Sequence, residues 1–319
     1  METRTIGKNG PKVSTVGLGC NNFGGRIDLA ATQKVVDAAI DAGITLFDTA
    51  DIYGGRTYNN YGGSEVDLGK ALGSRRKNVV VATKFGMAMN NESTLHGAKR
   101  AYVMKAAEDS LRRLNTDYID LYQIHTPDTA TPIEETLRAL DDLVKQGKVR
   151  YIGCSNFSNA QIDDGMATAL KLNLPPFVSS QDEYSLVVRD IERDPVPSIK
   201  KHGLGLLPYF PLASGLLTGK YQRDVAPPKG TRFAAGGPMS NRYMNPTNWA
   251  IVEKLEAFCA SRGHTLLELA YSWLLAHDFV PSVIAGATKP EQLEQNVQAG
   301  TWVMSPEELA EIDQITRPA

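Results

Sequence analysis

ITLFDTADIYG (residues 44–54) and VVVATKFG (residues 79–86) are the two stretches that decide the fold. Each opens with a short apolar run, which is typical of a strand buried on both faces in a parallel sheet. Ionisable side chains then follow: Asp48 and Tyr53 in the first stretch, and Lys84 in the second. The carboxyl ends of parallel strands are where α/β barrels build their active sites. The two stretches therefore predict a barrel with a polar site at one end.

The same pattern continues along the rest of the chain. Short apolar runs predict eight strands, at residues 15–19, 44–47, 79–83, 119–124, 151–154, 177–180, 204–208 and 282–285. Amphipathic stretches between them predict helices, among them residues 29–43, 101–114, 132–147 and 158–170. Strands that alternate with helices in this number predict an α/β fold, a (β/α)8 TIM barrel.

Two segments stand outside this alternation. Residues 3–14 predict an N-terminal β-hairpin with Asn9–Gly10 as its turn, and such a hairpin would plug the bottom of the barrel. Residues 222–247 are rich in Gly, Pro and Arg and predict a long irregular loop after the seventh strand, on the side of the site. No stretch has the composition of a linker, so residues 1–319 are predicted to form a single barrel domain.

Composition and charge exclude several classes of function. A net charge of −2 with 22% charged residues argues against a general binder of nucleic acid or of an anionic membrane. The three cysteines lack metal-site spacing, and neither a signal peptide nor a membrane-spanning stretch is recognisable. We therefore expect a cytoplasmic protein whose partner is a small molecule. A Rossmann or P-loop site is disfavoured because GxGxxG and GxxxxGK[ST] do not occur.

Four ionisable side chains would form one acid–base unit. A free phenol has a pKa of about 10, too high for efficient proton donation at neutral pH. Lys84 would lower the pKa of Tyr53, and Asp48 would keep Lys84 charged. His125 follows the apolar run at residues 119–124 and would align a carbonyl oxygen. A barrel enzyme that forms a Schiff base on Lys84 is an alternative interpretation.

Over essentially its whole length the chain resembles the aldo-keto reductases. Besides DTADIYG and VATKFG, the matching segments are GLGCNNFGG (17–25), YGGSEVDLGKAL (61–72), DYIDLYQIH (117–125), GKVRYIGCSNF (147–157), PLASGLLTGKY (211–221) and IAGATKPEQLEQN (284–296). In that family the residues that match Asp48, Tyr53, Lys84 and His125 are the catalytic tetrad, and NADP(H) binds across the barrel mouth. The resemblance thus implies an NADPH-dependent reductase of aldehydes and ketones.

The resemblance also implies which residues hold the cofactor. Ser155, Asn156 and Gln181 would pair with the nicotinamide carboxamide, and Tyr209 would stack on the nicotinamide ring. Thr288 and Lys289 would bind the 2′-phosphate at a helix N-terminus, where free N–H groups attract anions. The other implied contacts are Gly19, Cys20, Asn21, Asp48, Pro211, Leu212, Gly215, Lys220, Arg232, Gly286, Gln292, Gln295 and Asn296.

Two single positions and one three-residue stretch depart from the usual pattern of the family. Phe210 stands where many relatives carry serine, Gln295 replaces a frequent glutamate, and Cys20-Asn21-Asn22 changes the wall of the substrate pocket. Arg232 and Arg242 would serve either a substrate anion or the cofactor. The family also includes NADP-binding β-subunits of potassium channels, which gives the alternative function of a regulatory subunit. Those subunits commonly lack the histidine that His125 supplies.

Overall fold

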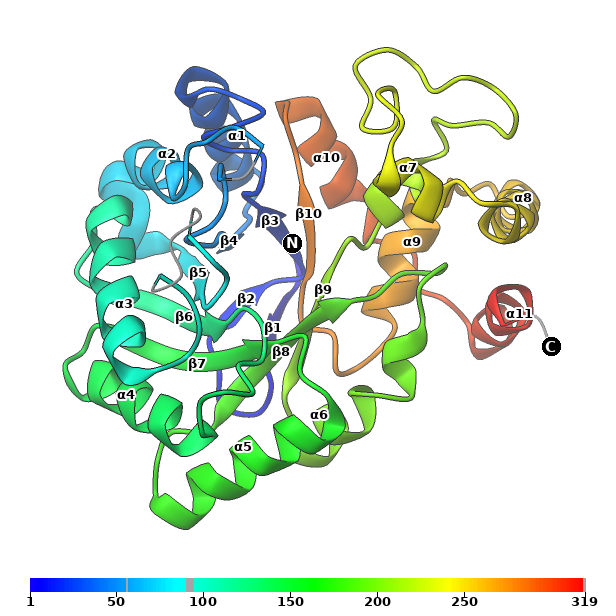
Figure 1. The fold of residues 1–319 in the computed structure, drawn as a ribbon. Coiled ribbons are helices and arrows are strands. Elements are labelled where there is room, and N and C mark those ends of the chain that lie inside the picture. The colour runs from blue at the N-terminus through cyan, green and yellow to red at the C-terminus, as the bar shows by residue number, and fades with distance from the viewer. Residues whose placement is uncertain (56, 90–94, 318–319) are drawn as a thin grey trace.

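Eight parallel strands form the centre of the molecule, and helices surround them (Figure 1). The computed structural model describes residues 1–55, 57–89 and 95–317. The order β10-β3-β4-β5-β6-β7-β8-β9 closes into a barrel, because β9 and β10 also contact each other. The strands are β3 (Val16–Gly19), β4 (Leu46–Asp48), β5 (Val80–Phe85), β6 (Ile119–Ile124), β7 (Val149–Ser155), β8 (Phe177–Glu183), β9 (Gly205–Tyr209) and β10 (Val283–Gly286). The predicted TIM barrel is confirmed, with strand ends shifted by a few residues.

The predicted helices are confirmed as α1 (Leu29–Asp41), α3 (Arg100–Leu114), α4 (Ile133–Lys145) and α5 (Asn159–Leu172). Their starts follow from local capping. Asp28 accepts the Ala31 N–H ahead of α1, and Ser158 forms a capping box with Gln161 ahead of α5. The other helices are α2 (Gly63–Leu72), α6 (Val196–His202), α7 (Pro238–Tyr243), α8 (Pro246–Ala260), α9 (Leu266–Leu275), α10 (Pro290–Ala299) and α11 (Pro306–Thr316), with short 3₁₀ turns η1 (Gly73–Asn78), η2 (Asp190–Glu192) and η3 (Ala213–Thr218).

The predicted hairpin is formed by β1 (Thr3–Thr5) and β2 (Lys12–Ser14), which pair antiparallel. It closes the bottom of the barrel, as predicted. Ile6 and Val13 are fully buried and pack in one cluster with apolar side chains of the barrel strands, namely Leu46, Ala82, Leu121, Val178, Leu207 and Ile284. This plug leaves the other end of the barrel, where the strands terminate, for a site.

The turn of the hairpin differs from the prediction. Asn9–Gly10 does not form a two-residue turn. The connection spans residues 6–11, closed by the Ile6 N–H bond to the Pro11 carbonyl at 3.0 Å, and its positive φ lies at Gly7 (57°). Contact with the barrel bottom explains the difference, because the Lys8 N–H donates to the Gly203 carbonyl at 3.0 Å.

Gly7→Ala is expected to destabilise the protein by about 2–4 kcal/mol, because a side chain there adds both backbone strain and overlap. A Cβ at Gly7 would lie 2.6 Å from the Val178 carbonyl oxygen. Gly43→Ala is the matched control, since Gly43 also has a positive φ (81°) but nothing within 4 Å. Denaturant unfolding measures both, and equal losses would contradict the close packing of the plug.

The long segment after β9 is less irregular than predicted. Residues 222–237 contain no helix or strand and project as a loop (yellow-green in Figure 1), but α7 and the start of α8 fall within the predicted loop. Proline occupies the first turn of both helices, where its missing N–H costs nothing.

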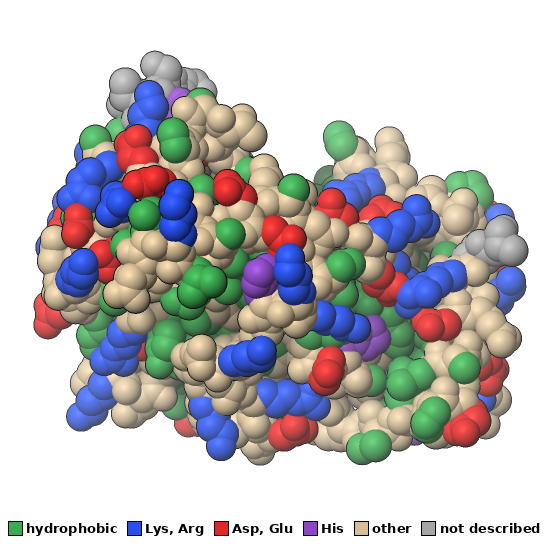
Figure 2. All heavy atoms as spheres, turned by 90° about the horizontal axis from the view of Figure 1, so that it is seen from below, with side chains coloured by type: hydrophobic (Ala, Val, Ile, Leu, Met, Phe, Trp, Pro, Cys, Tyr) green, Lys and Arg blue, Asp and Glu red, His purple; other side chains and the backbone are tan. Residues whose placement is uncertain are grey.

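In the part of the chain that is described, no helix is both long and apolar enough to cross a bilayer. On the face drawn in Figure 2, basic and acidic side chains are interspersed.

Candidate active site

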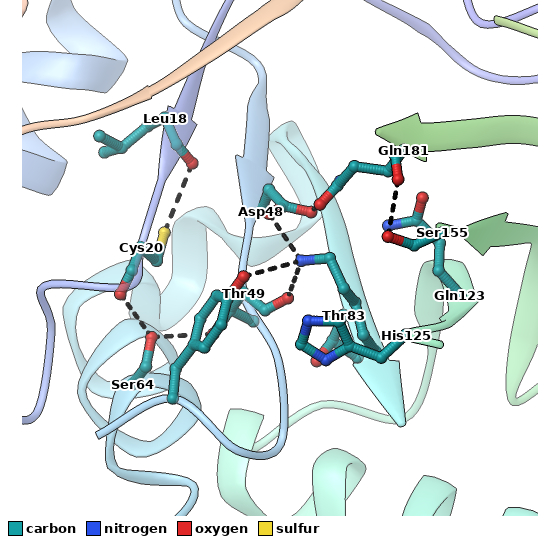
Figure 3. Close-up of polar contacts among 12 residues, drawn as sticks. Leu18, Cys20, Asp48, Thr49, Ser64, Thr83, Gln123, His125, Ser155 and Gln181 are labelled. Carbon is teal, nitrogen blue, oxygen red and sulfur yellow. Dashed lines mark hydrogen bonds and ion pairs between the residues drawn. The ribbon is translucent and has the colours of Figure 1, made fainter. Parts of the chain in front are cut away.

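The four predicted catalytic side chains lie together at the carboxyl ends of neighbouring strands. Asp48 is the last residue of β4, Lys84 lies near the end of β5, and His125 directly follows β6. Tyr53 comes from the loop after β4, and its ring lies 5.9 Å from that of His125 in an edge-on arrangement. Figure 3 shows Asp48 and His125 converging on the same space. Parallel pairing of β4, β5 and β6 aligns their ends and produces this convergence.

Lys84 is the centre of this group and is completely buried. Its Nζ donates to Asp48 Oδ2 at 2.7 Å, to the Thr49 carbonyl at 2.7 Å and to the Tyr53 hydroxyl oxygen at 3.4 Å. An ammonium has three N–H donors, so all three are used. Burial alone would lower the pKa of Lys84, but Asp48 and then Tyr53 outweigh it and raise this pKa. A Schiff-base lysine needs a lowered pKa, so this environment argues against that interpretation.

Tyr53 remains protonated at neutral pH. Burial raises its pKa, the Lys84 charge lowers it, and the Asp48 charge raises it again, with a net increase. Lys84 therefore lowers the pKa of Tyr53, as predicted, but burial outweighs this effect. Since Lys84 donates to the phenol oxygen, the Tyr53 O–H stays free to donate elsewhere.

His125 is neutral across the physiological range. Burial, with a smaller effect from the Lys84 charge, lowers the pKa of His125 to about 3. Its backbone N–H donates to the Phe85 carbonyl at 2.8 Å, which fixes the chain beside β5. Within the described residues, His125 Nδ1 is buried without a hydrogen-bond partner. A neutral imidazole with an unused ring nitrogen is suited to a hydrogen bond with an uncharged substrate oxygen.

The residues predicted to meet the nicotinamide adjoin this group. Gln181 Nε2 donates to Asp48 Oδ1 at 2.9 Å, and Ser155 Oγ donates to the Gln181 carbonyl at 2.7 Å (Figure 3). Asn156 Nδ2 donates to Ser155 Oγ at 3.0 Å, while Asn156 Oδ1 accepts the Tyr209 O–H at 2.8 Å. Amide and hydroxyl groups therefore continue directly from the acid–base group.

The loop after β9 has an unusual backbone. Phe210, Ala213 and Ser214 have φ of 50°, 46° and 57°, which side-chain-bearing residues adopt rarely, and Gly215 follows at 106°. Such strain clusters at ligand-binding sites, where the surrounding structure maintains it. The loop also carries the predicted contacts Pro211 and Leu212. A side chain at Gly215 would meet Lys220 Nζ at 3.2 Å, so the bare backbone lets this lysine lie close.

A group of cations lies near this loop. Burial, and then repulsion from Arg232 and Arg26, lowers the pKa of Lys220, and burial with Arg26 lowers that of Arg232. No acidic side chain of the described residues pairs with these three, and Arg26 donates to the Gly230 carbonyl at 3.1 Å. Uncompensated cations are suited to bind phosphate groups. Arg26 was not predicted, because a single arginine after Gly24 and Gly25 has no distinctive sequence pattern.

Arg242 is a different case. It was predicted to serve an anion of the substrate or the cofactor, but it forms an ion pair with Glu183 at 2.5 Å. The Tyr243 O–H donates to the same carboxylate. The charge of Arg242 is therefore already compensated, and Arg232 is the better candidate of the two.

The remaining predicted contacts lie at β3 and α10. Gly19 pairs in register with both Asp48 and Gly286, which places Cys20 and Asn21 beside the acid–base group. At the start of α10, the Thr288 N–H and hydroxyl both donate to Gln292 Oε1, at 2.8 and 3.1 Å. Lys289 precedes the helix and is exposed, as are Gln292 and Gln295, whereas Asn296 is buried.

These residues fit a phosphorylated dinucleotide. Hydrogen-bonding amides lie next to the acid–base group, cations without an acidic partner among the described residues lie near the loop after β9, and a helix N-terminus with an exposed lysine follows β10. A dinucleotide with an uncharged nicotinamide and two anionic regions matches this set of groups.

Comparisons with known proteins agree with this site. The model of the Aldo/keto reductase family matches residues 15–317. A probable voltage-gated potassium channel subunit beta of Arabidopsis thaliana is 33% identical, over 99% of this chain and 96% of that protein. An aldo-keto reductase of Bacillus subtilis (strain 168) is 34% identical, over 99% and 93%. The L-glyceraldehyde 3-phosphate reductase of Escherichia coli (strain K12) is 33% identical, over 98% and 92%.

Proposed function

The chain belongs to the aldo/keto reductase family, and on that premise we propose that it reduces aldehydes and ketones to alcohols with NADPH. The observation that carries this proposal is the bonding of Lys84, which links Asp48 to Tyr53 while leaving the Tyr53 proton free. A general acid needs a proton that it can give and a neighbour that stabilises the charge left behind. Both requirements are met by this pair.

The chain's own residues supply the proton and the alignment. When bound, the nicotinamide cofactor supplies a hydride for the carbonyl carbon. Tyr53 donates its proton to the carbonyl oxygen, and Lys84 stabilises the resulting phenolate through the N–H that already faces it. Asp48 keeps Lys84 charged and aimed. His125, being neutral, keeps one ring N–H with which it orients the carbonyl.

The cofactor would be held by the groups described above. Ser155, Asn156 and Gln181 would bind the carboxamide, and Tyr209 would cover one face of the nicotinamide. Lys220 and Arg232 would bind the diphosphate. The 2′-phosphate and adenosine contacts would come from Thr288, Lys289, Gln292, Gln295 and Asn296, with Gly19, Cys20, Asn21, Pro211, Leu212, Gly215 and Gly286 forming the adjoining walls.

A regulatory subunit of the potassium-channel β type is the alternative, and a relative carries that name. The presence of His125 within the acid–base group favours catalysis, because a protein that only binds a dinucleotide needs no such group. Another relative is named for reduction of an aldehyde, which supports aldehydes as the first substrates to test. Three unpaired cysteines suit a reducing compartment, so we place the enzyme in the cytoplasm as a single-domain protein.

A panel of aldehydes and ketones, followed by NADPH absorbance, tests the proposal. Oxidation of NADPH that depends on a carbonyl compound is expected, with alcohol formed in equal amount. Tight binding of NADPH without turnover of any compound would favour the regulatory alternative. Failure to bind NADPH at all would contradict both functions.

Lys289→Ala is expected to weaken NADPH binding about ten- to a hundredfold and to change NADH binding little, since a charge-assisted contact to the 2′-phosphate contributes roughly 1.5–3 kcal/mol. Fluorescence titration with both dinucleotides measures the effect. Lys171→Ala is the control, because Lys171 is an exposed lysine in the last turn of α5. Equal effects of Lys289→Ala on both dinucleotides would place Lys289 on a merely solvated surface.

A further inference from the structure

A buried carboxyl group lies directly behind the candidate site. Asp182 follows Gln181 on β8 and is 3% exposed. Its Oδ1 accepts the backbone N–H of Asn156 at 3.0 Å, and its Oδ2 accepts the Ser180 hydroxyl at 2.6 Å. Both donors are neutral, so neither supplies the opposite charge that normally accompanies a buried carboxylate.

The residue that Asp182 holds is central to the site. Asn156 has a φ of 61°, and its N–H is shared between Asp182 and the Gln181 carbonyl. Its side chain donates to the His125 carbonyl at 3.0 Å and accepts from Tyr209 at 2.8 Å. Asn156 therefore connects the chain at His125 with the aromatic ring proposed to cover the nicotinamide.

Asp182 contacts the site through the backbone of Asn156. Successive side chains of a strand point to opposite faces. Gln181 points to Asp48 inside the barrel, and Asp182 therefore points outward, toward the helix layer. Its contact with the Asn156 N–H is the link between the two faces.

The ionised carboxyl group of Asp182 does not stabilise the fold. Burial raises the pKa of Asp182 to about 6, although the bonds from Ser180 and Asn156 lower it, and the nearby charge of Asp194 raises it. The folded protein thus binds this proton more tightly than the unfolded chain, whose Asp pKa is about 3.9. Ionisation of Asp182 therefore lowers the stability of the fold as pH rises from about 4 to 6.

Two ionisable side chains near Asp182, those of Cys154 and Tyr209, do not titrate in that range. Burial raises the pKa of the Cys154 thiol, and burial with Glu183 and Asp182 raises that of Tyr209 to about 12. Both stay neutral near pH 6. Asp194, whose charge also lies near Asp182, accepts the Asn159 N–H at the start of α5.

We propose that Asp182 is a positioning residue whose ionised form holds Asn156 in place, so that cofactor affinity decreases when Asp182 is protonated. The proposal rests on the proposed NADPH function. An ionised acceptor forms a stronger bond to the Asn156 N–H than a neutral one does. Protonation would loosen Asn156 and, with it, the nicotinamide pocket.

Asp182→Asn tests the proposal, because it keeps the size of the side chain and removes its ionisation. Dissociation constants of NADPH and NADH are measured by fluorescence between pH 5 and 8. For the wild type, affinity is expected to rise with pH, with a midpoint near 6. For the variant, this step disappears for NADH, and NADPH binds about tenfold more weakly than to the wild type at pH 8. NADH is included because a 2′-phosphate itself titrates at a pH of about 6.

Ser180→Ala provides a second test. If Asp182 had a purely structural role, this substitution would not change the pH midpoint of NADH binding. The Ser180 hydroxyl lowers the pKa of Asp182, so its removal should shift the midpoint of NADH binding to higher pH. The Ser180→Ala measurement also tests the proposed role of Asp182 if the Asp182→Asn protein fails to fold. An unchanged midpoint in Ser180→Ala, or wild-type affinity in a folded Asp182→Asn protein at pH 8, would overturn the proposal. A wild type that binds neither dinucleotide would instead refute the proposed function.

Discussion

Tyr53→Phe lowers turnover of aldehydes by about 10²–10⁴ while NADPH binding stays nearly intact, because general acid catalysis contributes roughly that factor. The substitution removes only the hydroxyl that Lys84 bonds at 3.4 Å and keeps the half-buried ring beside His125. Steady-state kinetics with an aldehyde and fluorescence titration with NADPH measure the two quantities.

Tyr151→Phe is the control for this loss. Tyr151 also lies on a barrel strand, but it packs with the apolar cluster at the bottom of the barrel. Its hydroxyl is therefore far from the chemistry, and wild-type turnover is expected. Near-wild-type reduction by Tyr53→Phe would remove Tyr53 as the proton donor.

Lys84→Met is expected to abolish most of the activity, on the order of 10²-fold or more. Without the ammonium, the pKa of Tyr53 rises further, because burial and Asp48 already raise it. The phenol then becomes a weaker acid, and any residual activity should follow a different pH dependence. An undiminished rate with an unchanged pH–rate profile would contradict the coupling of Lys84 to Tyr53.

The same substitution also affects stability. It leaves Asp48 buried without its cation, which costs about 3–5 kcal/mol. The double variant Asp48→Asn/Lys84→Met removes both charges and should recover much of this stability without recovering activity. Thermal unfolding beside kinetics separates the two effects. Recovery of activity in the double variant would show that Lys84 has only a structural role.

The barrel was predictable because short, largely apolar runs that are typical of buried strands alternate with amphipathic helical stretches along the chain. The hairpin turn was not predictable from local sequence. Its conformation, with a positive φ at Gly7, depends on packing against Val178 and Gly203, which lie far along the chain. Helix α7 was missed because six residues are too few for a clear helical period.

The candidate site, too, could be predicted only in part from the sequence. Asp48, Lys84 and His125 follow predicted strands, so the geometry of parallel strands brings them together without further information. The Thr49 carbonyl that holds Lys84 is a backbone group and leaves no trace in the residue pattern. The effect of Asp182 on Asn156 depends on a contact between neighbouring strands, which local sequence does not specify.

Deuterium transfer from NADPH labelled at both C4 positions tests whether the protein catalyses the proposed reduction. The wild-type enzyme, an aldehyde of the panel and the labelled cofactor are incubated, and the alcohol is analysed by mass spectrometry and NMR. We expect one deuterium on the carbinol carbon of each alcohol formed, with the hydroxyl proton exchanging with solvent. Alcohol without deuterium at that carbon, or no alcohol from any aldehyde despite bound NADPH, would contradict it.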